Sequence, residues 1–199
     1  MKKSAPAAKR AVPSVPVSTR TAQNEIRFYR ANEKPYGAFS NLYQRPISFE
    51  NREYPTAEHA YQAGKPSKAE VREWILSAPS PSLVAMAAHG LYTWDIVPNW
   101  SQIKFERMRQ VLRAKFTQHE DLRELLLSTG DLRLVEVGKT NSAVNRVWGE
   151  VNGKGLNMLG VLLMEVRSEL RSEPIPKTPH KRATRENGLR RGQNSRAAA

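Results

Sequence analysis

Residues 156–170 constrain the fold most strongly, because apolar side chains cover several faces of the helix that their spacing predicts. Such a helix must be covered on several sides, so we expect it to be the buried central helix of a domain. Residues 101–116 also carry apolar side chains at helical spacing and predict a second long helix.

Shorter patterns predict the remaining elements. Two segments have the pattern of strands, and two further short runs meet at Asn51 as a hairpin. Ser67 with Glu70, and Thr117 with Glu120, each match a capping box, which is typical of a helix start. We expect an α+β fold, a mostly helical single domain with a small antiparallel sheet. The expected elements are strands 26–29, 46–49, 53–55 and 132–137, helices 56–64, 67–76, from about 82, 101–116, 118–128 and 156–170, and a long loop over 138–155.

The two ends of the chain differ in composition from the middle. The net charge is +13, yet residues 1–20 hold five Lys or Arg and no acid, and residues 171–199 carry a net +6. We therefore expect one domain over 23–171 between disordered basic tails, 1–22 and 172–199. The tails either add solubility or make weak, salt-sensitive contacts with nucleic acid phosphates.

The sequence also excludes several classes of protein. It has no Cys, which excludes disulfides, thiolate metal sites and a cysteine nucleophile. No apolar run approaches the roughly 18–20 residues that a membrane-spanning helix needs, so no membrane partner is expected. No signal-peptide pattern follows the first residues, so we expect a cytoplasmic protein.

The first candidate site is a polar stripe on the predicted helix 56–64. If Thr56 caps this helix, Glu58, Gln62 and Lys65 fall at i, i+4 and i+7 on one face. A carboxylate, an amide and an ammonium aligned in this way can hold a sugar, and Lys65 would keep Glu58 ionised. The alternative is a solvated polar face. With Glu58, Gln62 and Lys65 on one face of the helix, His59 would point away from that face, into the core.

Two further segments are candidates. Residues 94–100 form a loop with a tryptophan at each end, and a tryptophan can stack on a base or a sugar, or fill a core. Residues 145–157 form a Gly-containing loop that runs into a helix, where free N–H groups suit a phosphate; the alternative is a tight turn that needs glycine. The four His residues lack metal-ligand spacing, so no metal site is expected.

Taken together, these segments resemble the YbiA-like, or NADAR, family over about residues 26–171. The likeness rests on the order and spacing of several short motifs. They are Phe28-Tyr29, residues 36–42 (YGAFSNL), residues 55–63 (PTAEHAYQA) with Lys65, Trp100, Met108, residues 114–116 (AKF), residues 134–136 (LVE), Trp148-Gly149, Gly155, Asn157, Leu159-Gly160 and residues 162–164 (LLM).

The resemblance implies an N-glycosidase that acts without a metal or cofactor on the bond between ribose C1 and nitrogen. Members of the family cut phosphoribosylamino-pyrimidine intermediates of riboflavin synthesis, or remove ADP-ribose from guanine in nucleic acid. The family glutamate falls on Glu58 and the helix lysine on Lys65, which would pair with Glu58 and the sugar or attack C1 as an amine. We expect catalysis from these two residues. The expected substrate-binding residues are Asn41, Gln62, Trp100, Asn145, Trp148, Gly149, Gly155 and Asn157.

The chain departs from the family pattern at two positions. Family members often carry Asp where this chain has Asn145, and many carry Arg where it has Leu91. An amide can bind a hydroxyl but cannot act as a carboxylate base. Two alternatives to an N-glycosidase of riboflavin intermediates are therefore an ADP-ribosyl hydrolase acting on nucleic acid, and a non-catalytic module that binds NAD or ADP-ribose.

Overall fold

The computed structural model describes residues 24–173. The predicted tail 1–22 lies outside this range, as does the predicted tail 172–199 apart from its first two residues, of which Ser172 ends α7. None of the helices within residues 24–173 is long and apolar enough to span a bilayer. The elements are β1 (Glu25–Phe28), η1 (Tyr36–Phe39), β2 (Ile47–Phe49), β3 (Arg52–Tyr54), α1 (Ala57–Gln62), α2 (Ala69–Leu76), α3 (Pro81–His89), η2 (Thr93–Asp95), α4 (Trp100–Gln118), α5 (Glu120–Ser128), β4 (Arg133–Glu136), α6 (Ala143–Trp148) and α7 (Met158–Ser172).

Helix α7 is the buried helix that the sequence predicts. It packs against α4, α5, α6 and β4, and Leu159, Leu163 and Val166 are almost completely buried. The helix begins at Met158 rather than at residue 156, and Leu156 is exposed. At Gly160 a Cβ would lie 2.1 Å from the Leu134 carbonyl oxygen, so this glycine allows α7 to lie directly on β4.

Two small sheets accompany the helices. Strands β2 and β3 form the predicted antiparallel hairpin, with Glu50 and Asn51 both at positive φ in its turn. Strands β1 and β4 pair in parallel, with Ile26 opposite Leu134. The α+β class, mostly helical with a small antiparallel sheet, is confirmed. The parallel pair is an addition that the local pattern did not predict, because its strands are about 100 residues apart in sequence.

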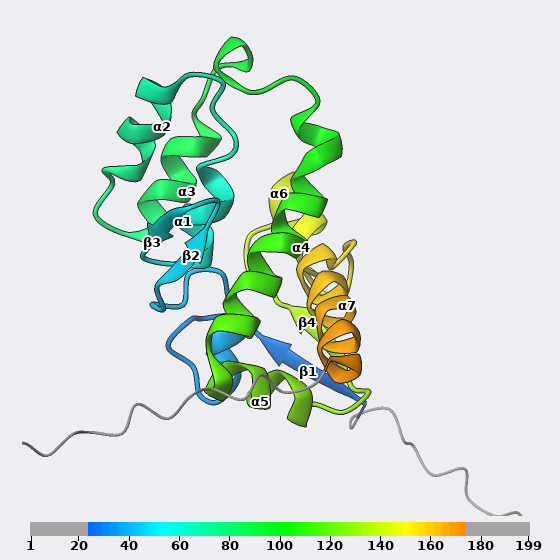
Figure 1. Ribbon diagram of the computed structural model, residues 1–199. Coiled ribbons are helices and arrows are strands. Elements are labelled where there is room, and N and C mark those ends of the chain that lie inside the picture. Colours follow the sequence, from blue (N-terminus) through cyan, green and yellow to red (C-terminus); the bar gives the residue numbers. More distant parts are fainter. Residues whose placement is uncertain (1–23, 174–199) are drawn as a thin grey trace, which may run out of the picture.

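The elements form two groups on either side of α4, the long green helix in Figure 1. Helices α1, α2 and α3 lie with the β2–β3 hairpin, whereas α6, α7, β1 and β4 lie on the other side. Lys115 of α4 is fully buried and donates to the carbonyl oxygens of Ala38 and Ser40, at 2.5 and 2.9 Å. It therefore fixes the segment that leads into Asn41.

Three local predictions are wrong. Helix α2 begins at Ala69, and the Ser67 hydroxyl donates to the Trp94 carbonyl instead of capping it. Thr117 lies inside α4, where its hydroxyl bonds back to the Arg113 carbonyl, so it cannot cap α5. The expected loop 138–155 contains α6, whose start is capped by the Ser142 side chain. Local hydrogen bonds of serine and threonine compete with the capping role in the first two cases.

Candidate active site

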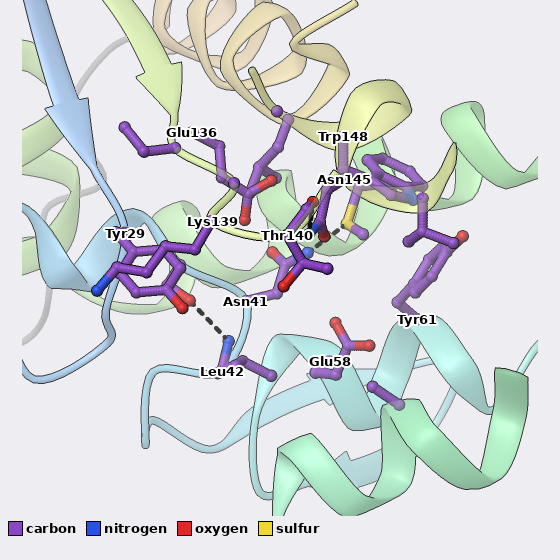
Figure 2. A pocket seen from close by; sticks show the side chains of 18 of the residues that line it. Tyr29, Asn41, Leu42, Glu58, Tyr61, Glu136, Lys139, Thr140, Asn145 and Trp148 are labelled. Carbon is purple, nitrogen blue, oxygen red and sulfur yellow. Dashed lines mark hydrogen bonds between the residues drawn. The ribbon is translucent and has the colours of Figure 1, made fainter. Parts of the chain in front are cut away.

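A cavity of about 270 Å³ lies between α1 and the segment that runs from the end of β4 to α6. Figure 2 shows Glu58 and Tyr61 on one side, Glu136, Asn145 and Trp148 on the other. The walls therefore come from both groups of elements that flank α4. Of the predicted site residues, this cavity brings together Asn41, Glu58, Gln62, Asn145, Trp148 and Gly149.

Glu58 is held in this cavity by both its backbone and its side chain. The Thr56 hydroxyl accepts from the backbone N–H of His59 and caps α1, as predicted, and the Glu58 N–H donates to the Asn41 carbonyl at 3.1 Å. Gln62, one turn further along, donates from Nε2 to Glu58 Oε1 at 2.8 Å. Only 7% of Glu58 is exposed, so this face of α1 is not a solvated polar face.

Burial determines the protonation of Glu58. Desolvation raises its pKa from 4.5 to about 7, and this effect exceeds the opposing effect of the hydrogen bond from Gln62. A carboxyl group with a pKa near neutrality is suited to general acid–base catalysis.

Lys65 does not lie on the stripe with Glu58 and Gln62, and its catalytic role stays a prediction. Helix α1 ends at Gln62, so Lys65 lies beyond the helix and leaves the stripe. Its ammonium group donates to the Ala88 carbonyl at 2.6 Å. Within residues 24–173 no ion pair joins it to Glu58, so the prediction that Lys65 keeps Glu58 ionised is wrong.

A second carboxyl group, which the sequence analysis did not assign to the site, faces the same cavity. Glu136 is the last residue of β4, and its carboxyl group lies across the cavity from Glu58 (Figure 2). Its backbone N–H donates to Asn157 Oδ1 at 3.0 Å and its carbonyl accepts from the Glu150 N–H at 2.8 Å. Desolvation, and then the charge of Glu58, raise its pKa from 4.5 to about 7. Two signals in the sequence point to it: its place near the end of the predicted strand 132–137, and its place in the motif 134–136 (LVE) of the family resemblance.

Aromatic rings line the cavity, but only one of the two tryptophans expected to bind substrate is among them. Tyr61 lies between the two predicted tryptophans, with ring centroids 5.3 Å from Trp100 and 5.5 Å from Trp148. Trp148 lines the cavity with Glu58, whereas Trp100 does not. At the opposite end Lys139 Nζ lies 4.7 Å from the centroid of the Tyr29 ring. Trp94 is exposed, stacks on Tyr92 and lines neither this cavity nor the one described below.

Within the segment 145–157, some of the expected site residues line the cavity and others do not. Asn145 and Gly149 line the cavity, and Asn145 Nδ2 donates to the Thr140 carbonyl at 2.7 Å. Asn157 does not line it: its amide bonds to the backbone of Glu136 and of Leu134, at 3.0 and 2.8 Å. At Gly155 a Cβ would lie 2.1 Å from the Gly149 carbonyl oxygen. Both residues therefore support the backbone around the cavity and do not line it, and their expected contacts with substrate stay a prediction.

Two residues that line the cavity, Asn41 and Gln62, each have one side-chain acceptor without a hydrogen-bond partner in the described part of the chain. Among the described residues, neither Asn41 Oδ1 nor Gln62 Oε1 has a hydrogen-bond partner, although both atoms are buried. Leaving a buried acceptor unpaired costs about 1–3 kcal/mol. Polar side chains and aromatic rings line the same cavity, a combination that suits a small polar ligand such as a sugar.

A second cavity, of about 290 Å³, adjoins the first and shares Tyr61, Gln62, His89 and Trp148 with it. Lys65, Lys104 and Trp100 line this second cavity and do not line the first. No group of three His, Asp or Glu side chains that could hold a metal occurs within residues 24–173.

Comparison with known proteins agrees with this geometry. The sequence model of the NADAR domain family matches residues 27–171. N-glycosidase YbiA of Shigella flexneri is 41% identical over 149 residues, which cover 74% of this chain and 89% of that protein. The riboflavin biosynthesis protein VVA0006 of Vibrio vulnificus is 33% identical over 155 residues, 77% of this chain and 41% of that protein. The NMR structure of Escherichia coli YbiA superposes with a TM-score of 0.68 at 38% identity, covering 80% of this chain and 92% of that one.

Proposed function

The chain belongs to the NADAR domain family, and we propose that it is an N-glycosidase acting on phosphoribosylamino-pyrimidine intermediates of riboflavin biosynthesis. The enzyme hydrolyses the bond between ribose C1 and the nitrogen of the pyrimidine precursor. The products are ribose 5-phosphate and a free aminopyrimidine.

The observation that carries this proposal is the Glu58 carboxyl group, buried in a cavity with aromatic walls and held by Gln62. Cleavage at C1 develops positive charge on the sugar, as glycoside hydrolysis does. A carboxylate fixed beside C1 stabilises that charge, and a pKa of about 7 allows the same group to exchange a proton at neutral pH.

The bond changes follow from these groups. Water adds through its oxygen to C1 while the C1–N bond breaks and its electron pair leaves with nitrogen. One carboxylate takes the proton from the water, and a protonated carboxyl group supplies the proton to the leaving nitrogen. Glu58 and Glu136 are the two candidates for these roles, because both line the cavity and both have a pKa of about 7.

The remaining residues position the sugar. Asn41 Oδ1 and Gln62 Oε1 accept hydrogen bonds from ribose hydroxyl groups, because both acceptors are buried without a partner in the described chain. Trp148 and Tyr61 pack against the ring of the base or the sugar. Asn145 can bind a hydroxyl group, whereas Glu58 and Glu136 supply the carboxyl chemistry that an amide cannot.

The test is to offer purified protein the phosphoribosylamino-pyrimidine and, separately, DNA with ADP-ribosylated guanine. Released sugar is identified by mass spectrometry. Release of ribose 5-phosphate from the pyrimidine supports the proposal. Release of ADP-ribose alone would assign the chain to ADP-ribosyl hydrolysis, and binding of ADP-ribose with no turnover of either substrate would make it a binding module.

A further inference from the structure

The second cavity is lined by more basic side chains than the first, and by no acidic side chain of the described residues. Its walls include Lys65, Lys104 and His89, and no Asp or Glu side chain among the described residues lines it. The first cavity carries two carboxyl groups, Glu58 and Glu136, beside one lysine, Lys139. An anionic group on a ligand is repelled by the first cavity when those groups ionise, and is attracted by the second.

The two lysines have hydrogen-bonding capacity left for a ligand. Lys65 is buried, and the one hydrogen bond that the described structure gives its ammonium group is to the Ala88 carbonyl, which uses one of three donors. Lys104 is half-buried, and its ammonium group lies 4.8 Å from the centroid of the Phe105 ring. No ion pair within residues 24–173 involves either lysine. Desolvation, and then the charge of Lys104, lower the pKa of Lys65, so the two ammonium groups lie close enough to repel each other.

We propose that this second cavity, lined by Lys65, Lys104, His89 and Trp100, binds the phosphate of the substrate. The inference rests on the proposed function, since it assigns the 5-phosphate of a ribose whose C1 lies beside Glu58. Lysine binds phosphate as a point charge, and a phosphate between two lysines removes their mutual repulsion. Tyr61, Gln62 and Trp148 line both cavities, so one ligand can span them.

This assignment replaces the phosphate site expected in the loop 149–157. In that loop Gly155 lies against the Gly149 carbonyl, and Asn157 bonds to the backbone of β4. The backbone N–H of Gly149 already donates to the Asn145 carbonyl, and that of Asn157 donates to the Gly149 carbonyl. Little of this backbone is free for a phosphate.

Ligand binding without turnover tests the site. The full chain is titrated with ribose 5-phosphate, with ADP-ribose and with ribose, following intrinsic tryptophan fluorescence, because Trp100 and Trp148 line the cavity. We expect ribose 5-phosphate to bind at least ten-fold more tightly than ribose. Lys104→Gln is expected to weaken binding of ribose 5-phosphate about ten-fold and to leave ribose binding unchanged. Comparing the affinities of ribose 5-phosphate and ADP-ribose shows whether the site prefers a phosphomonoester or a diphosphate.

The control is Lys68→Gln, which removes an exposed lysine that lines neither cavity and pairs with Asp95. The proposal is overturned if Lys104→Gln binds ribose 5-phosphate as tightly as the wild type does. It is also overturned if the substitution weakens the binding of ribose as much as the binding of ribose 5-phosphate. Failure of the proposed function gives a different result. In that case no ribose 5-phosphate is released from the pyrimidine substrate, whereas the effect of Lys104 on phosphate binding persists.

Discussion

Replacing Glu58 by Gln should stabilise the folded protein at pH 8 much more than at pH 5. The pKa of Glu58 is raised from 4.5 to about 7 because the carboxyl group is desolvated. A folded-state pKa above the unfolded value means that the folded protein binds the proton more tightly. The stability that comes from this proton is present at low pH and is lost as the pH rises from about 5 through 7.

The size of the effect follows from the shift. At about 1.4 kcal/mol for each pKa unit, a rise from 4.5 to about 7 corresponds to about 3 kcal/mol between pH 5 and pH 8. The amide introduced by Glu58→Gln cannot ionise, so the variant should lack this loss. The pKa of Glu136 should also fall, because the charge of Glu58 helps to raise it. Both changes favour the variant at high pH.

Urea unfolding followed by circular dichroism measures this effect at the two pH values. Glu53→Gln, which removes an exposed carboxylate outside the cavity, is the matched control for the loss of one acid. The reasoning is refuted if Glu58→Gln changes the free energy of unfolding equally at pH 5 and pH 8, or if it destabilises the protein more at pH 8.

Two further substitutions test the supports of the site. Gly149→Ala should lower the free energy of unfolding by about 1–3 kcal/mol, since its Cβ would lie 2.5 Å from the Glu136 carbonyl oxygen. The control is Gly90→Ala, whose Cβ meets nothing closer than 3.5 Å. Equal stability of the two variants would contradict the expected clash at Gly149. Asn157→Ala should lower the melting temperature, because the backbone groups of Glu136 and Leu134 lose a buried hydrogen-bond partner and alanine disfavours φ of 51°. A variant that kept wild-type stability but had lost turnover would instead support the substrate contact expected from the sequence.

The sequence predicts one side of the site well. Thr56 as a helix cap and the i, i+4 spacing of Glu58 and Gln62 are local properties, and the structure has both. Lys65 shows the limit of this argument. The periodicity holds only while the helix continues, and α1 ends at Gln62.

The other side of the site depends on contacts between distant segments. Glu136 faces Glu58 because β4 pairs with β1 and Gly149 then packs on the end of β4. Glu136 belongs to the motif 134–136 (LVE) of the family resemblance, but the local alternation of the strand does not distinguish it from a surface residue. The structural roles of Gly155 and Asn157 have the same origin, since a Gly-containing turn and a phosphate-binding loop share one local pattern.

Turnover of the phosphoribosylamino-pyrimidine by Glu58→Gln is the most direct test of the central claim, that this buried carboxyl group cleaves the C1–N bond. The substitution keeps the size of the side chain and an acceptor for Gln62, so the variant should fold and should still bind ribose 5-phosphate. We expect kcat to fall by at least about 100-fold, the scale typical of a general acid–base group. A folded variant that releases ribose 5-phosphate at the wild-type rate would contradict the account.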